Sequence, residues 1–172
     1  KTGCVSCHHN SLTAITVSAV RKAGLPVNEQ IARQQRDDIG KYVELWRERV
    51  LQGQGIPGDS DTIAHILAGL AAEQFPPDPA TDALAQYLKN DQLLDGRSRI
   101  DAHRPPLETS EIEFTALALR GLQAYAPKAQ RPKYDTAMWR MADWIRSARP
   151  RTNTDRAFQI LGLVWAGEDP AT

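Results

Sequence analysis

The chain has 172 residues, which is long enough to bury a substantial hydrophobic core and short enough to fold as one domain. Its 21 basic and 21 acidic side chains cancel, so no net field favours nucleic acid or a charged membrane surface as a partner. The longest apolar run, residues 63–72, is interrupted by His65 and is too short to cross a bilayer, so no transmembrane segment is expected.

The first feature along the chain is the segment Cys4-Val5-Ser6-Cys7-His8. It has the C-x-x-C-H pattern by which haem c is attached covalently to a polypeptide. Two intervening residues let both thiols reach the same edge of one porphyrin, where each thiol adds across a vinyl group. The following histidine can turn its imidazole toward the iron, and histidine is a common haem ligand. The segment therefore predicts one covalent haem c, tethered by Cys4 and Cys7, with His8 as the proximal iron ligand.

Three other chemistries remain open for these cysteines. A C-x-x-C redox centre usually lies at a strand-to-helix turn, and no strand is expected around Cys4. A zinc site would need two further ligands, for which His9, His65 and His103 are the only nitrogen donors and no third cysteine exists. A disulfide between Cys4 and Cys7 is the third alternative. Haem attachment is preferred because no other cysteine is present to serve these alternatives.

The remainder of the chain predicts helices and no strand. Apolar side chains recur at helical spacing up to residue 22, after a cap at Asn10 or Ser11, and again over residues 28–52. Five more helices are expected: one around 63–70 capped by Asp59, Ser60 or Asp61, one over 80–90, one opening at 108–111, one from about Pro132, and one capped within residues 152–155. The prediction is an all-α single domain, 1–172, with a haem-attachment segment over 1–10 and about seven helices over 11–167.

The predicted helices contain an internal repeat. Three segments superpose on a glycine: Ile66-Leu67-Ala68-Gly69-Leu70, Leu119-Arg120-Gly121-Leu122 and Ile160-Leu161-Gly162-Leu163. Aromatic-aliphatic pairs recur in the helices between them, as Tyr42-Val43, Tyr87-Leu88 and Trp144-Ile145. The spacing of about 40 to 55 residues is typical of helix-pair repeats. We therefore expect α/α repeats that form an arc or partial toroid.

One stretch resembles the repeat motif of the squalene-hopene cyclase and prenyltransferase-like family. After Tyr87-Leu88 the chain reads Gln92-Leu93-Leu94-Asp95-Gly96-Arg97-Ser98, similar to Q-x-x-D-G-x-W with serine in place of tryptophan. The resemblance implies an α/α-toroid scaffold. The segment 59–64 is similar to the acidic motif of the cyclising members with one aspartate missing, but helix capping explains it better. The prenyltransferase zinc set is not reproduced, because both cysteines lie in one segment, so neither activity is predicted.

The second axial ligand of a haem would decide what the haem does. His103 is the preferred distal ligand, followed by His65 and Met141, and Arg104 is a candidate contact for a haem propionate. Two strong ligands would make the haem an electron carrier, whereas an open sixth position would allow oxygen, nitric oxide or peroxide to bind.

These features predict an exported monohaem c-type cytochrome that transfers electrons and is not an enzyme. In layout it resembles bacterial proteins that join a C-x-x-C-H segment to such repeats. In the bacterial c-type cytochromes that this segment resembles, haem attachment is completed outside the cytoplasmic membrane. A periplasmic or extracellular location is therefore expected, with the chain beginning at Lys1 after processing or as a piece of a longer protein. Its partners would be a redox protein or other cytochrome subunits. The alternatives are a repeat-built interaction module or subunit of an oligomer or larger assembly, in which the haem is structural, and a haem enzyme with an open sixth position.

Overall fold

The computed structural model describes residues 7–100, 103–104 and 108–169, and this part of the chain contains seven α-helices and no strand. The helices are α1 (Cys7–Lys22), α2 (Glu29–Leu51), α3 (Asp59–Ala72), α4 (Pro79–Asn90), α5 (Glu111–Tyr125), α6 (Arg131–Ser147) and α7 (Asn153–Trp165), with a 3-10 helix at Lys128–Gln130. The all-α prediction with about seven helices is confirmed.

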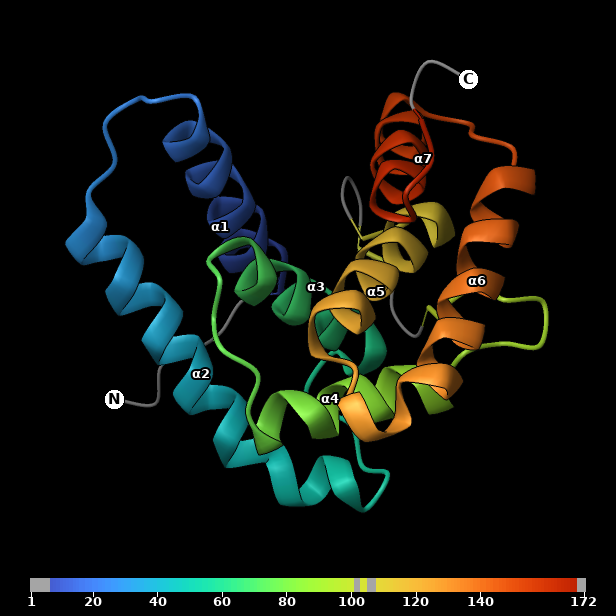
Figure 1. The fold of residues 1–172 in the computed structure, drawn as a ribbon, viewed down its shortest axis with the longest axis horizontal. Coiled ribbons are helices and arrows are strands. Elements are labelled where there is room, and N and C mark those ends of the chain that lie inside the picture. Colours follow the sequence, from blue (N-terminus) through green and yellow to red (C-terminus); the bar gives the residue numbers. More distant parts are fainter. Residues whose placement is uncertain (1–6, 101–102, 105–107, 170–172) are drawn as a thin grey trace.

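The helices are arranged in an inner and an outer row. Figure 1 shows α1, α3, α5 and α7 following one another across the molecule, with α2, α4 and α6 outside them. Each inner helix packs against the next, α2 packs against α4, and α6 packs against α5 and α7. This packing agrees with the predicted helix pairs, and their closure into an arc or partial toroid stays a prediction.

The three repeat glycines hold the inner helices close together. A Cβ atom at each glycine would lie too near the preceding inner helix for a normal contact: at Gly69 it would be 2.9 Å from Ser11 Cα, at Gly121 2.8 Å from Leu67 Cβ, and at Gly162 2.9 Å from Ala116 Cβ. The glycines that align in sequence therefore share one structural task. Each allows its helix to approach the one before it.

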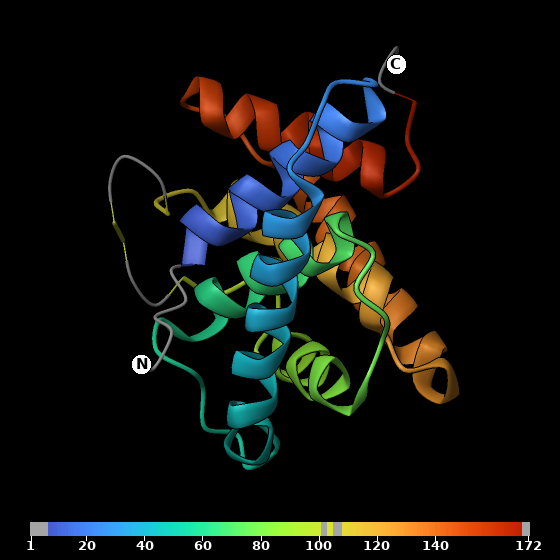
Figure 2. The ribbon, with the colours of Figure 1, turned by 90° about the vertical axis from the view of Figure 1, so that its left-hand side faces the viewer.

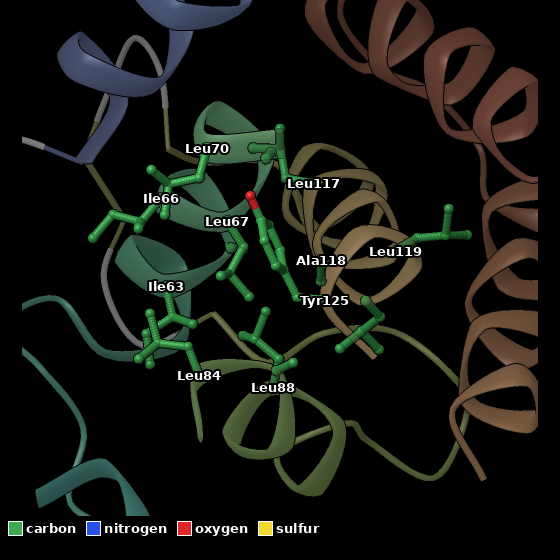
Figure 3. Packing of buried hydrophobic residues seen from close by; sticks show 14 of the residues in the cluster. Ile63, Ile66, Leu67, Leu70, Leu84, Leu88, Leu117, Ala118, Leu119 and Tyr125 are labelled. Carbon is green, nitrogen blue, oxygen red and sulfur yellow. The ribbon is translucent and has the colours of Figure 1, made fainter. Parts of the chain in front are cut away.

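The hydrophobic core lies where α3, α4 and α5 meet. Figure 3 shows aliphatic side chains of these helices gathered near Tyr125, with Leu119 on the other side of α5. Its labelled residues are all buried: Ile63, Ile66, Leu67, Leu70, Leu84, Leu88, Leu117, Ala118, Leu119 and Tyr125. Burying each large side chain contributes about 1.5–3 kcal/mol relative to its exposure. The Tyr125 hydroxyl donates a hydrogen bond to the carbonyl of Phe75 over 3.1 Å, so its one polar atom is satisfied.

The Gln92–Gly96 segment fixes a turn against α6. The Gln92 side-chain amide donates to the carbonyls of Gly96 at 2.8 Å and of Ala137 at 2.9 Å. Gly96 has a φ of 103°, and a Cβ there would collide with the carbonyl oxygen of Arg140. Gln92 and Gly96 therefore hold the turn after α4 against α6, the next outer helix.

Two predicted helix starts are wrong. Helix α1 begins at Cys7 rather than after Asn10 or Ser11, and Ser11 is buried beside Gly69. Helix α3 is preceded by Gly58 at a φ of 85°, and no side-chain hydrogen bond caps it. The aspartate and serine at its start bond to α4 instead, as described below. By contrast, the predicted cap of α7 is confirmed, since Thr152 and Asp155 form a reciprocal capping box.

Candidate functional site

His8 lies in the first turn of α1, at the edge of the inner row. Its side chain is 24% exposed, so it is partly buried. Cys4 and the side chain of Cys7 lie outside the described residues, although the backbone of Cys7 begins α1. The helix places His8 directly after the second predicted attachment point.

One partner of His8 is a buried carboxylate 100 residues away in sequence. His8 Nδ1 lies 2.8 Å from Oε1 of Glu108, whose side chain is only 1% exposed. Figure 2 shows why they meet: the first turn of α1 lies beside the segment that leads into α5. Glu108 has a φ of 56°, and its carbonyl accepts a hydrogen bond from the Arg104 N–H over 3.0 Å. This left-handed backbone conformation and the hydrogen bond from Arg104 place the Glu108 carboxylate beside α1.

Arg104 approaches the second oxygen of the same carboxylate. Its Nη1 lies 3.6 Å from Glu108 Oε2, and its side chain is 52% exposed. Glu108 therefore stands between a guanidinium and an imidazole, which compensates for burying its negative charge. Of the site residues predicted from sequence, His8 and Arg104 are brought together in this way.

The contact with Glu108 determines which nitrogen of His8 can bind a metal. An ionised carboxylate only accepts hydrogen bonds, so the proton of a neutral imidazole must lie on Nδ1. The lone pair is then on Nε2, which is the nitrogen that would ligate iron. Metal-binding histidines commonly donate their other N–H to a carboxylate or carbonyl, which fixes the ring and makes it a stronger ligand. The arrangement fits a proximal haem ligand.

The three predicted distal ligands lie in different surroundings. His103 is exposed and lines an open cavity of about 420 Å³ between the starts of α5 and α7 and the end of α6. His65 is fully buried in α3, and Met141 is fully buried in α6. The structure leaves the identity of the distal ligand a prediction.

His65 belongs to a buried polar cluster between α3 and α5. Its Nδ1 bonds to the carbonyl of Asp61 at 2.9 Å, and its Nε2 lies 3.6 Å from Oε1 of Glu113. Its ring stands edge-on to Phe114, with the ring centroids 5.4 Å apart. Within the part of the chain that the structure describes, neither oxygen of Glu113 accepts a hydrogen bond. Burying polar atoms without hydrogen-bond partners costs free energy, so this cluster lowers the stability of the fold.

The acidic segment at the start of α3 joins that helix to α4. The Tyr87 hydroxyl donates to Asp59 Oδ1 over 2.5 Å, and the Ser60 hydroxyl donates to Asp91 Oδ2 over 2.5 Å. Asp59 has a φ of 49°, a left-handed conformation that aspartate tolerates better than most residues. These contacts account for Asp59 and Ser60 structurally.

Sequence reasoning missed Glu108 and Glu113. The sequence predicts that Glu108 and Glu111 both belong to the stretch that opens a helix, and no local pattern separates the two glutamates. Glu113 does carry a usable signal, because a charged residue next to Phe114 and four before Leu117 lies on an apolar face. No protein-family model, curated protein or solved structure matches the chain.

Proposed function

We propose that this protein is a monohaem c-type cytochrome that transfers electrons through one covalently bound haem c. The observation that supports this most directly is the 2.8 Å contact between His8 Nδ1 and Glu108, located where C-x-x-C-H predicts the proximal ligand. A haem would supply an iron that accepts and releases one electron. The proposal includes export to the periplasm or the outside of the cell, with a redox protein or further cytochrome subunits as partners. None of the helices in the described ranges is long and apolar enough to cross a bilayer.

Each residue of the site has a separate task in this proposal. Cys4 and Cys7 would form the two thioether bonds, and His8 would ligate iron through Nε2. Glu108 holds the His8 ring in one orientation and one tautomer, so the ligand does not reorganise when the iron changes charge. Arg104 places a positive charge 3.6 Å from Glu108, and its half-exposed guanidinium would pair with a haem propionate. His103 is the proposed distal ligand.

One observation favours a second candidate function. His65 and Met141 are fully enclosed by the core, so each would have to leave its packing to reach a haem at the surface. If His103 does not ligate the iron either, the sixth position is open, and the protein would be a haem enzyme that binds oxygen, nitric oxide or peroxide.

The test begins with the covalent bond. The chain is exported from cells that carry out c-type maturation, denatured and extracted with acidified acetone, and a pyridine haemochrome spectrum is recorded. We expect a c-type band that stays with the polypeptide, and its loss in the Cys4→Ser, Cys7→Ser double variant. Absence of attached haem from the unaltered chain would reject the proposal.

Carbon monoxide then separates the two candidate functions. An electron carrier with two strong axial ligands should keep its reduced spectrum under carbon monoxide, whereas an open site should bind the gas readily. The His103→Ala variant provides the matched comparison. If His103 is the distal ligand, this variant alone should acquire carbon monoxide binding.

A further inference from the structure

Helix α7 exposes an apolar stripe on the side away from α5. Its members follow the spacing i, i+3, i+4 and i+7, so they share one face: Ala157, Ile160, Leu161 and Val164. All four are exposed, and Ile160, Leu161 and Val164 are 57%, 39% and 41% exposed. We call these four residues the α7 face. Figure 1 places α7 at the end of the inner row.

The same face is covered on the two preceding inner helices. Counted from the repeat glycine, Leu67 lies two residues before Gly69 and packs against Gly121 of the next inner helix. Ala116 lies five residues before Gly121 and packs against Gly162 of the next. Gln123, two residues after Gly121, donates its amide to the carbonyl of Trp165 on α7.

The equivalent positions on α7 are those of the exposed stripe. Counting from Gly162, Ile160 corresponds to Leu67, Ala157 to Ala116, and Val164 to Gln123. The face that receives a following inner helix on α3 and on α5 is therefore present on α7 and uncovered.

The inner helices also share one direction, which fixes how a further helix would lie. Ser11 at the start of α1 contacts Gly69 of α3, and Arg21 near the end of α1 pairs with Glu73 after α3 over 3.0 Å. Residue numbers therefore increase in the same direction along both helices, so α1 and α3 are parallel. The pairs α3 with α5 and α5 with α7 behave in the same way. A further inner helix would run parallel to α7, with a small residue against Ala157.

We propose that the α7 face binds a partner protein that presents a further helix pair of this repeat type, an outer helix followed by an inner helix with a glycine at the Gly162 register. The proposal rests on the repeat packing and not on the haem. It extends an interface already used three times in the chain.

A second copy of the chain fits this face less well. Stacking copies head to tail would place α1 on α7, but the exposed residues of α1 include the polar side chains of His9, Thr13 and Thr16. A two-fold pairing of α7 with itself would bring two copies of the same aliphatic side chains together. Because Gly162 is already packed against Ala116, no glycine would lie at that contact to let the helices approach as closely as the inner helices do.

The experiment supplies the helix pair within the full chain. A second copy of residues 126–166, which contains α6 and α7, is inserted after Ala166. In the inserted chain, the copied glycine follows Gly162 by the same number of residues as Gly162 follows Gly121. The copied glycine should therefore lie against the α7 face in the way that Gly162 lies against α5. Amide hydrogen exchange is measured in the original α7, with and without the insertion.

The expected result is a slowing of exchange in the original α7 by roughly tenfold or more, because the new pair covers its exposed face. Ile160→Glu in the original copy should abolish this slowing. The same substitution in the chain without the insertion should leave the fold unchanged, because Ile160 is 57% exposed there. Equal exchange with and without Ile160→Glu, or an inserted copy that stays unfolded, would overturn the proposal. A dimer of the unaltered chain in sedimentation that Ile160→Glu dissolves would also overturn it, in favour of a second copy.

Discussion

Replacing Glu108 by glutamine isolates the charge that the proposed proximal ligand feels. Glutamine has nearly the same shape and can still accept from His8 Nδ1 through its side-chain oxygen. A hydrogen bond to a charged partner contributes about 1.5–3 kcal/mol and a neutral one about 0.5–1.5 kcal/mol, so the change removes about 1 kcal/mol. Because Glu108 is only 1% exposed, water does not restore that difference.

The loss should appear in the reduction potential. A carboxylate makes the imidazole donate more electron density to the iron, which favours the oxidised form. Removing the carboxylate should therefore favour the reduced form. Only the part of this loss that differs between the oxidised and reduced states shifts the potential. For one electron, 1 kcal/mol corresponds to about 40 mV, so we expect the midpoint potential of Glu108→Gln to rise by at most about that amount. The assay is a spectroelectrochemical titration at pH 7. Glu111→Gln is the matched control, since Glu111 lies three residues away, is 45% exposed and pairs with Arg97. An unchanged or lowered potential in Glu108→Gln would refute the role given to this carboxylate.

Three further predictions concern stability. Gly121→Ala should destabilise the fold by about 1 kcal/mol in urea unfolding, because overpacking against the Leu67 Cβ outweighs the gain in helix propensity; Gly40→Ala, whose new methyl would meet only the movable ring edge of Phe75, should not. Burial raises the pKa of Asp155, but hydrogen bonds from Ser110 and from the backbone of Arg151 and Thr152 lower it by more than burial raises it. The pKa of Asp155 therefore lies below its usual value. The resulting stability is present above about pH 4 and is lost as the pH falls through the folded pKa; Asp155→Asn should flatten this acid dependence and cost about 1 kcal/mol at pH 7, which urea unfolding at several pH values would show. Burial raises the pKa of Tyr134 to about 12. Because an unfolded tyrosine ionises near pH 10, stability present below about pH 10 should decline as the pH rises toward 12, and Tyr134→Phe should reduce that decline in thermal unfolding curves.

The helices could be predicted from sequence because their signals are local. Apolar spacing identified all seven, and the Thr152–Asp155 capping box is contained in four consecutive residues. The repeat glycines were also visible, since aligned segments share them. Their function was not visible, because the residue against each glycine comes from another helix: Ser11 for Gly69 and Leu67 for Gly121.

The site was predictable only in part, for the same reason. The C-x-x-C-H segment is local, and it located His8 without knowledge of the fold. Glu108 lies 100 residues away, and its arrival at His8 depends on a left-handed backbone conformation that glutamate rarely adopts. The start of α3 was mispredicted because Asp59 and Ser60 have the composition of caps, yet tertiary bonds to Tyr87 and Asp91 use their side chains instead.

The two proposals place their surfaces at opposite ends of the inner row. His8 lies on α1, the first inner helix, and the α7 face lies on the last, with α3 and α5 between them. Neighbouring helices pack about 8–10 Å apart, so these ends are separated by roughly 25 Å. A partner on α7 would then leave the haem end accessible to a redox protein. Sites this far apart without shared contacts should act independently. The chain that carries the inserted copy of residues 126–166, with both Glu108→Gln and Ile160→Glu, should therefore show the full rise in potential and the full loss of exchange protection in the original α7. A change in potential caused by Ile160→Glu alone would mean that the two ends are coupled.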